Sequence, residues 1–168
     1  MSQESAPSQR RRIEELIFVK APYFVSGTLF LIAATINIVN IVARYVFARP
    51  IFWAEEILIF TMIWAVFVVA ISITYRGMHL CMDLIYSTLT PQLKMAVNIL
   101  ITVTFLICTI FTAAQSWKVV SLHYRNGAVT AGTDIPLVIP HSAVLFGFTF
   151  MAVAVLVRLR AYITGRFD

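Results

Sequence analysis

The stretch Ile57–Tyr75, ILIFTMIWAVFVVAISITY, contains no charged residue and decides the class of fold. Three further uncharged stretches of similar length accompany it, at Ala21–Ala43, Met95–Trp117 and Ile135–Val157. A helix rises about 1.5 Å per residue, so about 20 apolar residues cross the roughly 30 Å hydrocarbon core of a bilayer. The four stretches therefore predict four transmembrane helices.

The composition of the whole chain agrees with this class. Of the 168 residues, 60% are hydrophobic and 12% are charged, and the mean hydropathy is +0.87. A soluble domain of this size could not bury so much apolar surface. The alternating pattern of a membrane β-barrel is absent, and helices satisfy their backbone polar groups within each span. We therefore expect an all-α integral membrane protein with one compact helical domain.

The predicted division of the chain follows the uncharged stretches. Residues 1–20 are expected to form a cytoplasmic N-terminal tail, residues 21–157 the membrane domain, and residues 158–168 a cytoplasmic C-terminal tail. The spans within the membrane domain are predicted at 21–43, 55–75, 95–117 and 135–157. Pro22 suits the first turn of the first helix. This span is longer than the apolar core of a signal peptide, so we expect it to remain as an anchor.

The positions of lysine and arginine predict the orientation, because cytoplasmic loops are enriched in both. Nine of the 13 lie in the two tails and the second connection, namely Arg10, Arg11, Arg12, Lys20, Arg76, Lys94, Arg158, Arg160 and Arg166. The first and third connections hold the other four, Arg44, Arg49, Lys118 and Arg125. Both termini are therefore expected in the cytoplasm. Topology accounts for the net charge of +5, and no basic domain indicates nucleic-acid binding.

Charge is concentrated between the first two predicted spans, in the stretch Arg44–Phe60, RYVFARPIFWAEEILIF. An antiparallel helix pair would bring Arg44 to the depth of Glu55 and Glu56, and we expect one glutamate to pair with it, with Glu56 as the favoured structural residue. Successive helical residues point about 100° apart, so the other glutamate would face a partner. Trp53 would anchor the connection at the membrane interface. Alternatively, the acids only complement the positive end of a helix dipole.

The second span and the segment after it supply further candidates. Trp64 and Phe67 lie at i and i+3 and could form a stripe that contacts another subunit or lipid. Arg76, His79 and Asp83 fall at i, i+3 and i+7, and would share one face if the helix continued through the glycine after Arg76. For His79, a solvated surface position is favoured over a metal ligand.

Several activities lack support in the sequence. No charged residue lies in the middle of a span, where ion-coupled transporters usually carry acids. Nucleophile elbows, phosphate loops and metal-binding motifs are absent as sequence patterns. Cys81 and Cys108 form no CxxC motif and are expected to be packing residues. We expect no catalytic residue, cofactor or metal site.

Two alternative functions are kept open. A haem-bearing anchor of a redox complex would need facing histidines, and His123 and His141 both fall on the same predicted side. A stand-alone multidrug exporter would need a carboxylate within the membrane, and Glu55 and Glu56 lie too near a helix start to serve that role easily. A Soret band, or transport by this chain alone, would support the respective alternative.

Three motifs resemble one family of transport proteins. These are NIVARYVFARPIFWAEEI (40–57), WAVFVVAISITYRGMHLCMDLI (64–85) and TDIPLVIPHSAVLFGF (133–148). Together with the four spans, they resemble the small membrane subunit (DctQ type) of tripartite ATP-independent periplasmic (TRAP) transporters. The likeness runs from Asn37 to about Gly147. The chain departs from the family in ARPIFW, where a serine-containing turn is frequent.

The resemblance implies a role and a set of partners. The family's small subunit pairs with a large permease subunit, which moves an organic acid driven by sodium, while a periplasmic binding protein delivers the substrate. The small subunit is thought to enlarge the scaffold beside the moving domain. The chain ends at Asp168, so the large subunit is expected to be a separate chain. The expected location is the bacterial inner membrane, in contact with lipid.

Overall fold

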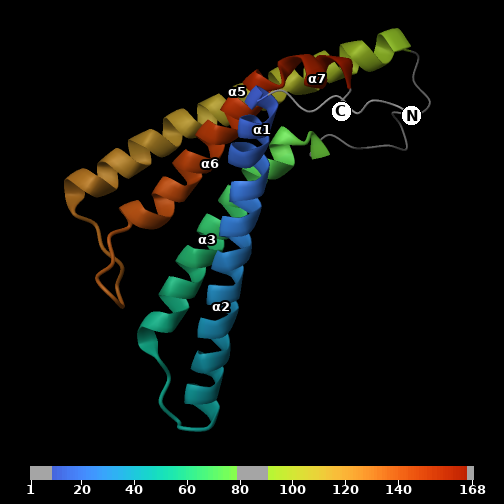
Figure 1. Ribbon diagram of the computed structural model, residues 1–168. Coiled ribbons are helices and arrows are strands. Elements are labelled where there is room, and N and C mark those ends of the chain that lie inside the picture. The colour runs from blue at the N-terminus through green and yellow to red at the C-terminus, as the bar shows by residue number, and fades with distance from the viewer. Residues whose placement is uncertain (1–8, 79–90, 166–168) are drawn as a thin grey trace, which may run out of the picture.

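A computed structural model describes residues 9–78 and 91–165, most of which are helical (Figure 1). The helices are α1 (Gln9–Glu15), the π-helix η1 (Leu16–Lys20), α2 (Ala21–Tyr45), α3 (Phe52–Tyr75), α5 (Pro91–Asn126), α6 (Val138–Val157) and α7 (Leu159–Thr164). The described ranges contain no strand, only an isolated bridge between Val129 and Pro136. Within these ranges, four helices are long and apolar enough to cross a membrane, which confirms the prediction of an all-α membrane protein.

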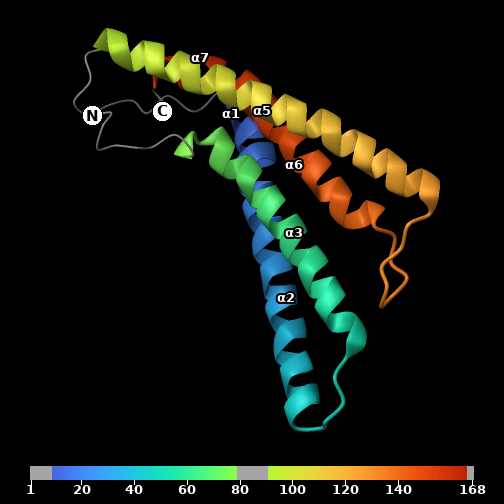
Figure 2. The same cartoon turned by 180° about the vertical axis from the view of Figure 1, so that it is seen from behind.

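The four long helices form a row in the order α2–α3–α6–α5. Helix α3 packs against α2 on one side and α6 on the other, and α5 packs against α6. Figures 1 and 2 show two antiparallel hairpins, α2–α3 and α5–α6, that meet at one end and diverge toward the other. This open row differs from the compact domain that the composition led us to expect.

Two names describe the ends of this row. The terminus end is where α1 and α7 lie together with the end of α3 (Figure 1). The connection end holds the α2–α3 connection (residues 46–51) and the α5–α6 connection (residues 127–137).

The first helix begins earlier than expected. It runs from Gln9 through η1 into α2, instead of starting near Pro22. The proline ring cannot donate to the carbonyl four residues before it, and in a regular helix it would crowd that carbonyl. The π-turn Leu16–Lys20 lies immediately before this position, where the Ala21 N–H donates to the Leu16 carbonyl. π-Turns of this kind occur where the regular pattern of α-helical hydrogen bonds is interrupted.

Helix α5 is much longer than a bilayer requires. Its 36 residues extend about 54 Å at the helical rise, against roughly 30 Å of hydrocarbon. The helix therefore continues well beyond the predicted span 95–117 and reaches Asn126, since its polar ends are compatible with helix outside the lipid core. Helix α7 packs against α5 at the terminus end.

The buried apolar core lies at the terminus end, where the two hairpins meet. Phe18, Ile71, Tyr75 and Met151 belong to one cluster, and the rings of Phe18 and Tyr75 stack with centroids 5.1 Å apart. Helix α3 stops just beyond this core, because Gly77 has a φ of +70° that ends the helical path.

The outward faces of the row are apolar and uncovered. Phe24 on α2 is 77% exposed and Leu100 on α5 is 67% exposed. A monomeric protein in water rarely leaves such large apolar patches uncovered. These faces therefore require lipid or a partner subunit around them.

Candidate functional site at the connection end

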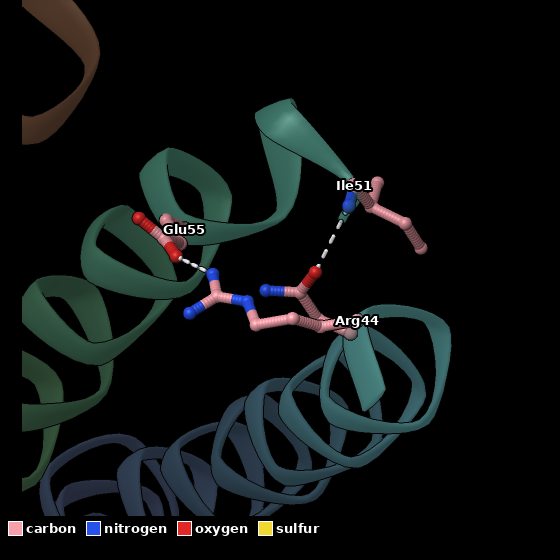
Figure 3. Close-up of polar contacts among 4 residues, drawn as sticks. Arg44, Ile51 and Glu55 are labelled. Atoms are coloured by element: carbon pink, nitrogen blue, oxygen red, sulfur yellow. Dashed lines mark hydrogen bonds and ion pairs between the residues drawn. The ribbon is translucent and has the colours of Figure 1, made fainter. Parts of the chain in front are cut away.

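The α2–α3 connection is held by two polar contacts from α2 (Figure 3). Asn40 is buried, and its Oδ1 accepts a hydrogen bond from the Ile51 N–H at 3.0 Å. Arg44, one helical turn further on, forms an ion pair with Glu55 in the first turn of α3. The two contacts fix the start of α3 against the end of α2, in agreement with the antiparallel pairing expected from the sequence.

The Arg44–Glu55 pair borders an open groove. Its volume is about 450 Å³, and its walls include Asn37, Ile41 and Tyr45. The side chains of Arg44 and Glu55 are 47% and 64% exposed, so the pair remains accessible to another molecule. The groove therefore has a polar rim beside apolar side chains.

Glu56 makes a different set of contacts, with the α5–α6 connection. Its Oε2 accepts hydrogen bonds from the hydroxyls of Thr130, at 2.8 Å, and Thr133. Its Oε1 accepts the Gly132 N–H at 3.1 Å. One carboxylate thus gathers three donors from a connection 74 to 77 residues away.

Arg44 pairs with Glu55 and not with Glu56, and the structural role favoured for Glu56 stays a prediction. The helical phase gives the reason: Glu55 points toward α2, and Glu56, about 100° further round the helix, points toward the α5–α6 connection. Both glutamates have partners within the chain. Of the two glutamates, only Glu55 lines the open groove, together with Arg44.

The tip of the α2–α3 hairpin is rich in exposed aromatic side chains. Tyr45, Phe47 and Phe52 are 80%, 69% and 84% exposed, and Trp53 is 48% exposed. Aromatic rings of this kind gather at membrane interfaces and in subunit contacts. Trp53 lies at this tip, and its role as an anchor at the membrane interface stays a prediction.

Trp64 and Phe67 lie between α3 and α6. The Trp64 indole N–H donates to the Ile139 carbonyl at 3.2 Å. The Phe67 ring lies 5.6 Å from that of Phe148, and Phe67 also touches Gly147 so closely that a Cβ there would be 2.7 Å from its ring. The structure thus gives both residues contacts inside the chain, and a role at a subunit interface stays a prediction.

Of the polar set at the end of the second span, only Arg76 lies within the described residues. Its guanidinium carbon is 5.3 Å from the centre of the Tyr23 ring, which fits a cation–π contact at the terminus end. His79 and Asp83 lie outside the described residues. The shared face required α3 to continue through Gly77, and α3 ends at Tyr75.

A second polar cluster, at the terminus end, was not anticipated from the sequence. The buried Tyr162 of α7 donates its hydroxyl hydrogen to the Thr74 carbonyl. Burial raises the pKa of Tyr162 to about 12, against a smaller lowering by Arg158, so the hydroxyl remains a neutral donor at physiological pH. The Arg158 guanidinium carbon lies 4.9 Å from the centre of the Tyr75 ring. These contacts tie α7 to the end of α3.

His123 at the end of α5 and His141 in the first turn of α6 lie in direct contact. Their ring centroids are 4.5 Å apart, with planes tilted by 47°. Contact this close leaves no room for a macrocycle between the two rings. The arrangement therefore does not favour the haem alternative. Among the described residues, no three or more His, Cys, Asp or Glu side chains group as a metal site.

The helices and their contacts define a multi-pass helical membrane protein whose polar contacts lie mainly toward the two ends of the row. The sequence model of the family described as tripartite ATP-independent periplasmic transporters, DctQ component, matches residues 30–165, and the chain belongs to this family. No curated protein sequence matches the chain significantly. The family resemblance drawn from the sequence motifs is confirmed.

Family membership makes the chain a small component of a TRAP transporter. It implies association with the other components of such a system, a large permease and a binding protein. The family is a class of transporter components and not a class of enzymes.

Proposed function

We propose that this chain is the small permease subunit that scaffolds a separate large transport subunit for sodium-driven uptake of an organic acid. A periplasmic binding protein would deliver the substrate. The family match over residues 30–165 carries the proposal. The sequence adds that no charged residue lies at the middle of any span, so this chain has little means of handling an ion or acid by itself.

The open row of helices fits a scaffolding role. Helices α2 and α5 stand at its two edges and leave large apolar side chains uncovered, such as Phe24 and Leu100. A second membrane subunit packed against either edge would cover that surface. Since the row is held by its own core at the terminus end, it can serve as a rigid partner for a moving domain.

We further propose an orientation in the bacterial inner membrane with both termini in the cytoplasm. The nine-to-four distribution of lysine and arginine supports it. The gathering of α1 and α7 at one end of the row also fits termini on one side (Figure 1). The connection end, with the Arg44–Glu55 groove, would then face the periplasm and be available to the binding protein or the large subunit.

Reconstitution tests the function. The large subunit, the binding protein and a panel of organic acids are placed in proteoliposomes with and without this chain, under an inward sodium gradient. Uptake should require all three proteins, the binding protein loaded with its acid, and the gradient. Uptake by the large subunit and binding protein without this chain would contradict the scaffolding role, and transport by this chain alone would support the exporter alternative.

A further inference from the structure

The groove beside the Arg44–Glu55 pair belongs to the ends of two membrane-spanning helices. Helix α3 has 24 residues and extends about 36 Å, slightly more than the roughly 30 Å of a bilayer's hydrocarbon core. Glu55 lies in the first turn of α3, and Arg44 lies in the last turn of α2. We therefore expect the ion pair near one surface of the membrane, at the level of the phospholipid headgroups.

The lining of the groove changes from charged to apolar along the two helices. The charged side chains, Arg44 and Glu55, lie close to the α2–α3 connection (Figure 3). About one turn further into the spans the lining is apolar, with Ile41, Leu58 and Ile59. A phospholipid has the same order, because its acyl chains extend from the headgroup into the bilayer. The groove volume of about 450 Å³ falls within the range of small-molecule sites, about 300–1,000 Å³.

The two charges of the groove match a headgroup that carries both signs. Arg44 donates from Nη2 to Oε1 of Glu55, and the two side chains are 47% and 64% exposed. A guanidinium has about five N–H donors and a carboxylate accepts about four hydrogen bonds, so both groups can bind further partners. A phosphoethanolamine group joins a phosphate to an ammonium by a short carbon chain. Its phosphate can accept from Arg44 while its ammonium donates to Glu55.

Two asparagines add donors on the same face of α2. Asn37, Asn40 and Arg44 fall at i, i+3 and i+7, and all three line the groove. The Asn40 Oδ1 accepts the Ile51 N–H, so its Nδ2 has hydrogens to donate. Asn37 is exposed and lies about 10 Å further into the span than Arg44. An amide exposed to hydrocarbon requires a polar partner, and the ester carbonyls of a phospholipid, which lie deeper than its phosphate, can accept from Asn37.

We propose that this groove binds one phospholipid with a phosphoethanolamine headgroup. The phosphate contacts Arg44, the ammonium contacts Glu55, and an acyl chain follows Ile41 and Ile59. Phosphatidylcholine fits less well, because its quaternary ammonium has no N–H to donate to the carboxylate. Phosphatidylglycerol fits least, because it has no cation and brings a negative charge next to Glu55. The site goes beyond the transport role and does not depend on it, since it is complete within this chain and serves in either orientation.

The test uses the full chain, purified in detergent and freed of lipid by repeated washing. Palmitoyl-oleoyl phosphatidylethanolamine, phosphatidylcholine and phosphatidylglycerol are each titrated into the micelles. Native mass spectrometry counts the bound lipid, and thermal unfolding is followed in parallel. We expect about one phosphatidylethanolamine per chain, bound at least about threefold more tightly than phosphatidylglycerol, with a higher unfolding temperature when it is bound. Equal affinity for the three lipids would overturn the proposal, because it would show only a general affinity for lipid.

Substitutions of the ion pair should act differently on the two headgroups. Glu55→Gln should weaken the binding of phosphatidylethanolamine about three- to tenfold and should not weaken that of phosphatidylglycerol. Arg44→Gln should weaken the binding of both lipids, because both carry a phosphate. Arg49→Gln and Asp134→Asn are the matched controls, since they remove the same charges at the connection end from positions outside the groove lining. Both controls should bind phosphatidylethanolamine as the unaltered chain does.

A third variant keeps the test decisive if the ion-pair variants fail to fold. Asn37→Ala leaves the Arg44–Glu55 pair in place and changes an exposed side chain, so before lipid is added it should unfold like the unaltered chain. It should bind phosphatidylethanolamine at least about twofold more weakly, since it lacks one hydrogen bond to the lipid. Unchanged binding of phosphatidylethanolamine in the folded variants would overturn the proposal and leave the groove to a segment of another subunit.

Discussion

Arg44 near the end of α2 and Glu55 in the first turn of α3 form an ion pair across the α2–α3 connection, on the rim of an open groove. Glu56, the next residue, turns away from this pair and binds the α5–α6 connection. Two adjacent carboxylates thus have two separate tasks, and substitutions should separate them.

The pair should contribute little to the stability of the isolated subunit. Because Arg44 and Glu55 are 47% and 64% exposed, Glu55→Gln should lower the free energy of unfolding by less than about 1 kcal/mol. Thermal unfolding of the purified subunit in detergent measures this. If the groove contacts another component, the same variant should reduce co-purification with the large subunit or binding protein. A large loss of stability, with assembly unchanged, would contradict this division of roles.

Glu56 should act on the α5–α6 connection instead. Removing its carboxylate in Glu56→Ala leaves the Gly132 N–H without its acceptor and leaves the Thr130 and Thr133 hydroxyls, as donors, only their bond to each other. Hydrogen exchange at Gly132 should then become faster, and the connection should be cut more readily by protease. Glu55→Ala is the matched control and should leave both measurements unchanged. Equal exchange in the two variants would mean that Glu56 does not hold the connection.

The membrane class and the number of helices followed from the sequence because uncharged stretches of this length have few alternatives. The order of the helices within the row could not be predicted from the sequence. A helix such as Phe52–Tyr75 is apolar nearly all round, so no single face identifies its neighbours. Helix ends were also predicted incorrectly. Helix α5 continues to Asn126, through a polar stretch outside the lipid core, where the length of an apolar stretch no longer indicates where the helix ends.

The site was predicted in part for a similar reason. The depth of Arg44 relative to the two glutamates follows from antiparallel pairing, which the sequence pattern supplies. The choice between Glu55 and Glu56 depends on the helical phase at the start of α3, which a residue count cannot define. The donors to Glu56 come from Thr130–Thr133, a connection that looks in the sequence like an ordinary glycine-containing loop.

The contact between Gly147 of α6 and Phe67 of α3 should be sensitive to a single methyl group. In Gly147→Ala the new Cβ would lie 2.7 Å from the Phe67 ring and 2.8 Å from the Phe67 Cβ, so one helix must move. Overpacking of this kind costs about 1–3 kcal/mol. Thermal unfolding should show this loss of stability in Gly147→Ala. The control Gly27→Ala should show no such loss, because its Cβ meets no atom within 4 Å. Equal stability of the two variants would show that α3 and α6 are less tightly packed.

The start of α3 should depend on Asn40. In Asn40→Ala the Ile51 N–H loses its acceptor next to a buried position, which should cost about 1–2 kcal/mol. Asn40→Asp retains an acceptor oxygen and should recover part of the loss. Asn37→Ala, an exposed position on the same face, is the control and should be nearly neutral. The unfolding temperatures of the three variants measure these effects. An equal loss of stability at positions 37 and 40 would contradict the role of Asn40.

The orientation of the row predicts which positions an impermeant thiol reagent can reach. If the termini lie in the cytoplasm, Asn126 at the end of α5 is expected on the periplasmic side. The charge distribution then predicts that a cysteine placed at Thr88 lies on the cytoplasmic side. Both native cysteines, Cys81 and Cys108, are first replaced by serine. In intact cells with a permeable outer membrane, Asn126→Cys should react and Thr88→Cys should not, while both should react once the inner membrane is opened. Labelling of Thr88→Cys alone in intact cells would reverse the orientation, and it would place the Arg44–Glu55 groove on the cytoplasmic side, out of reach of a periplasmic binding protein.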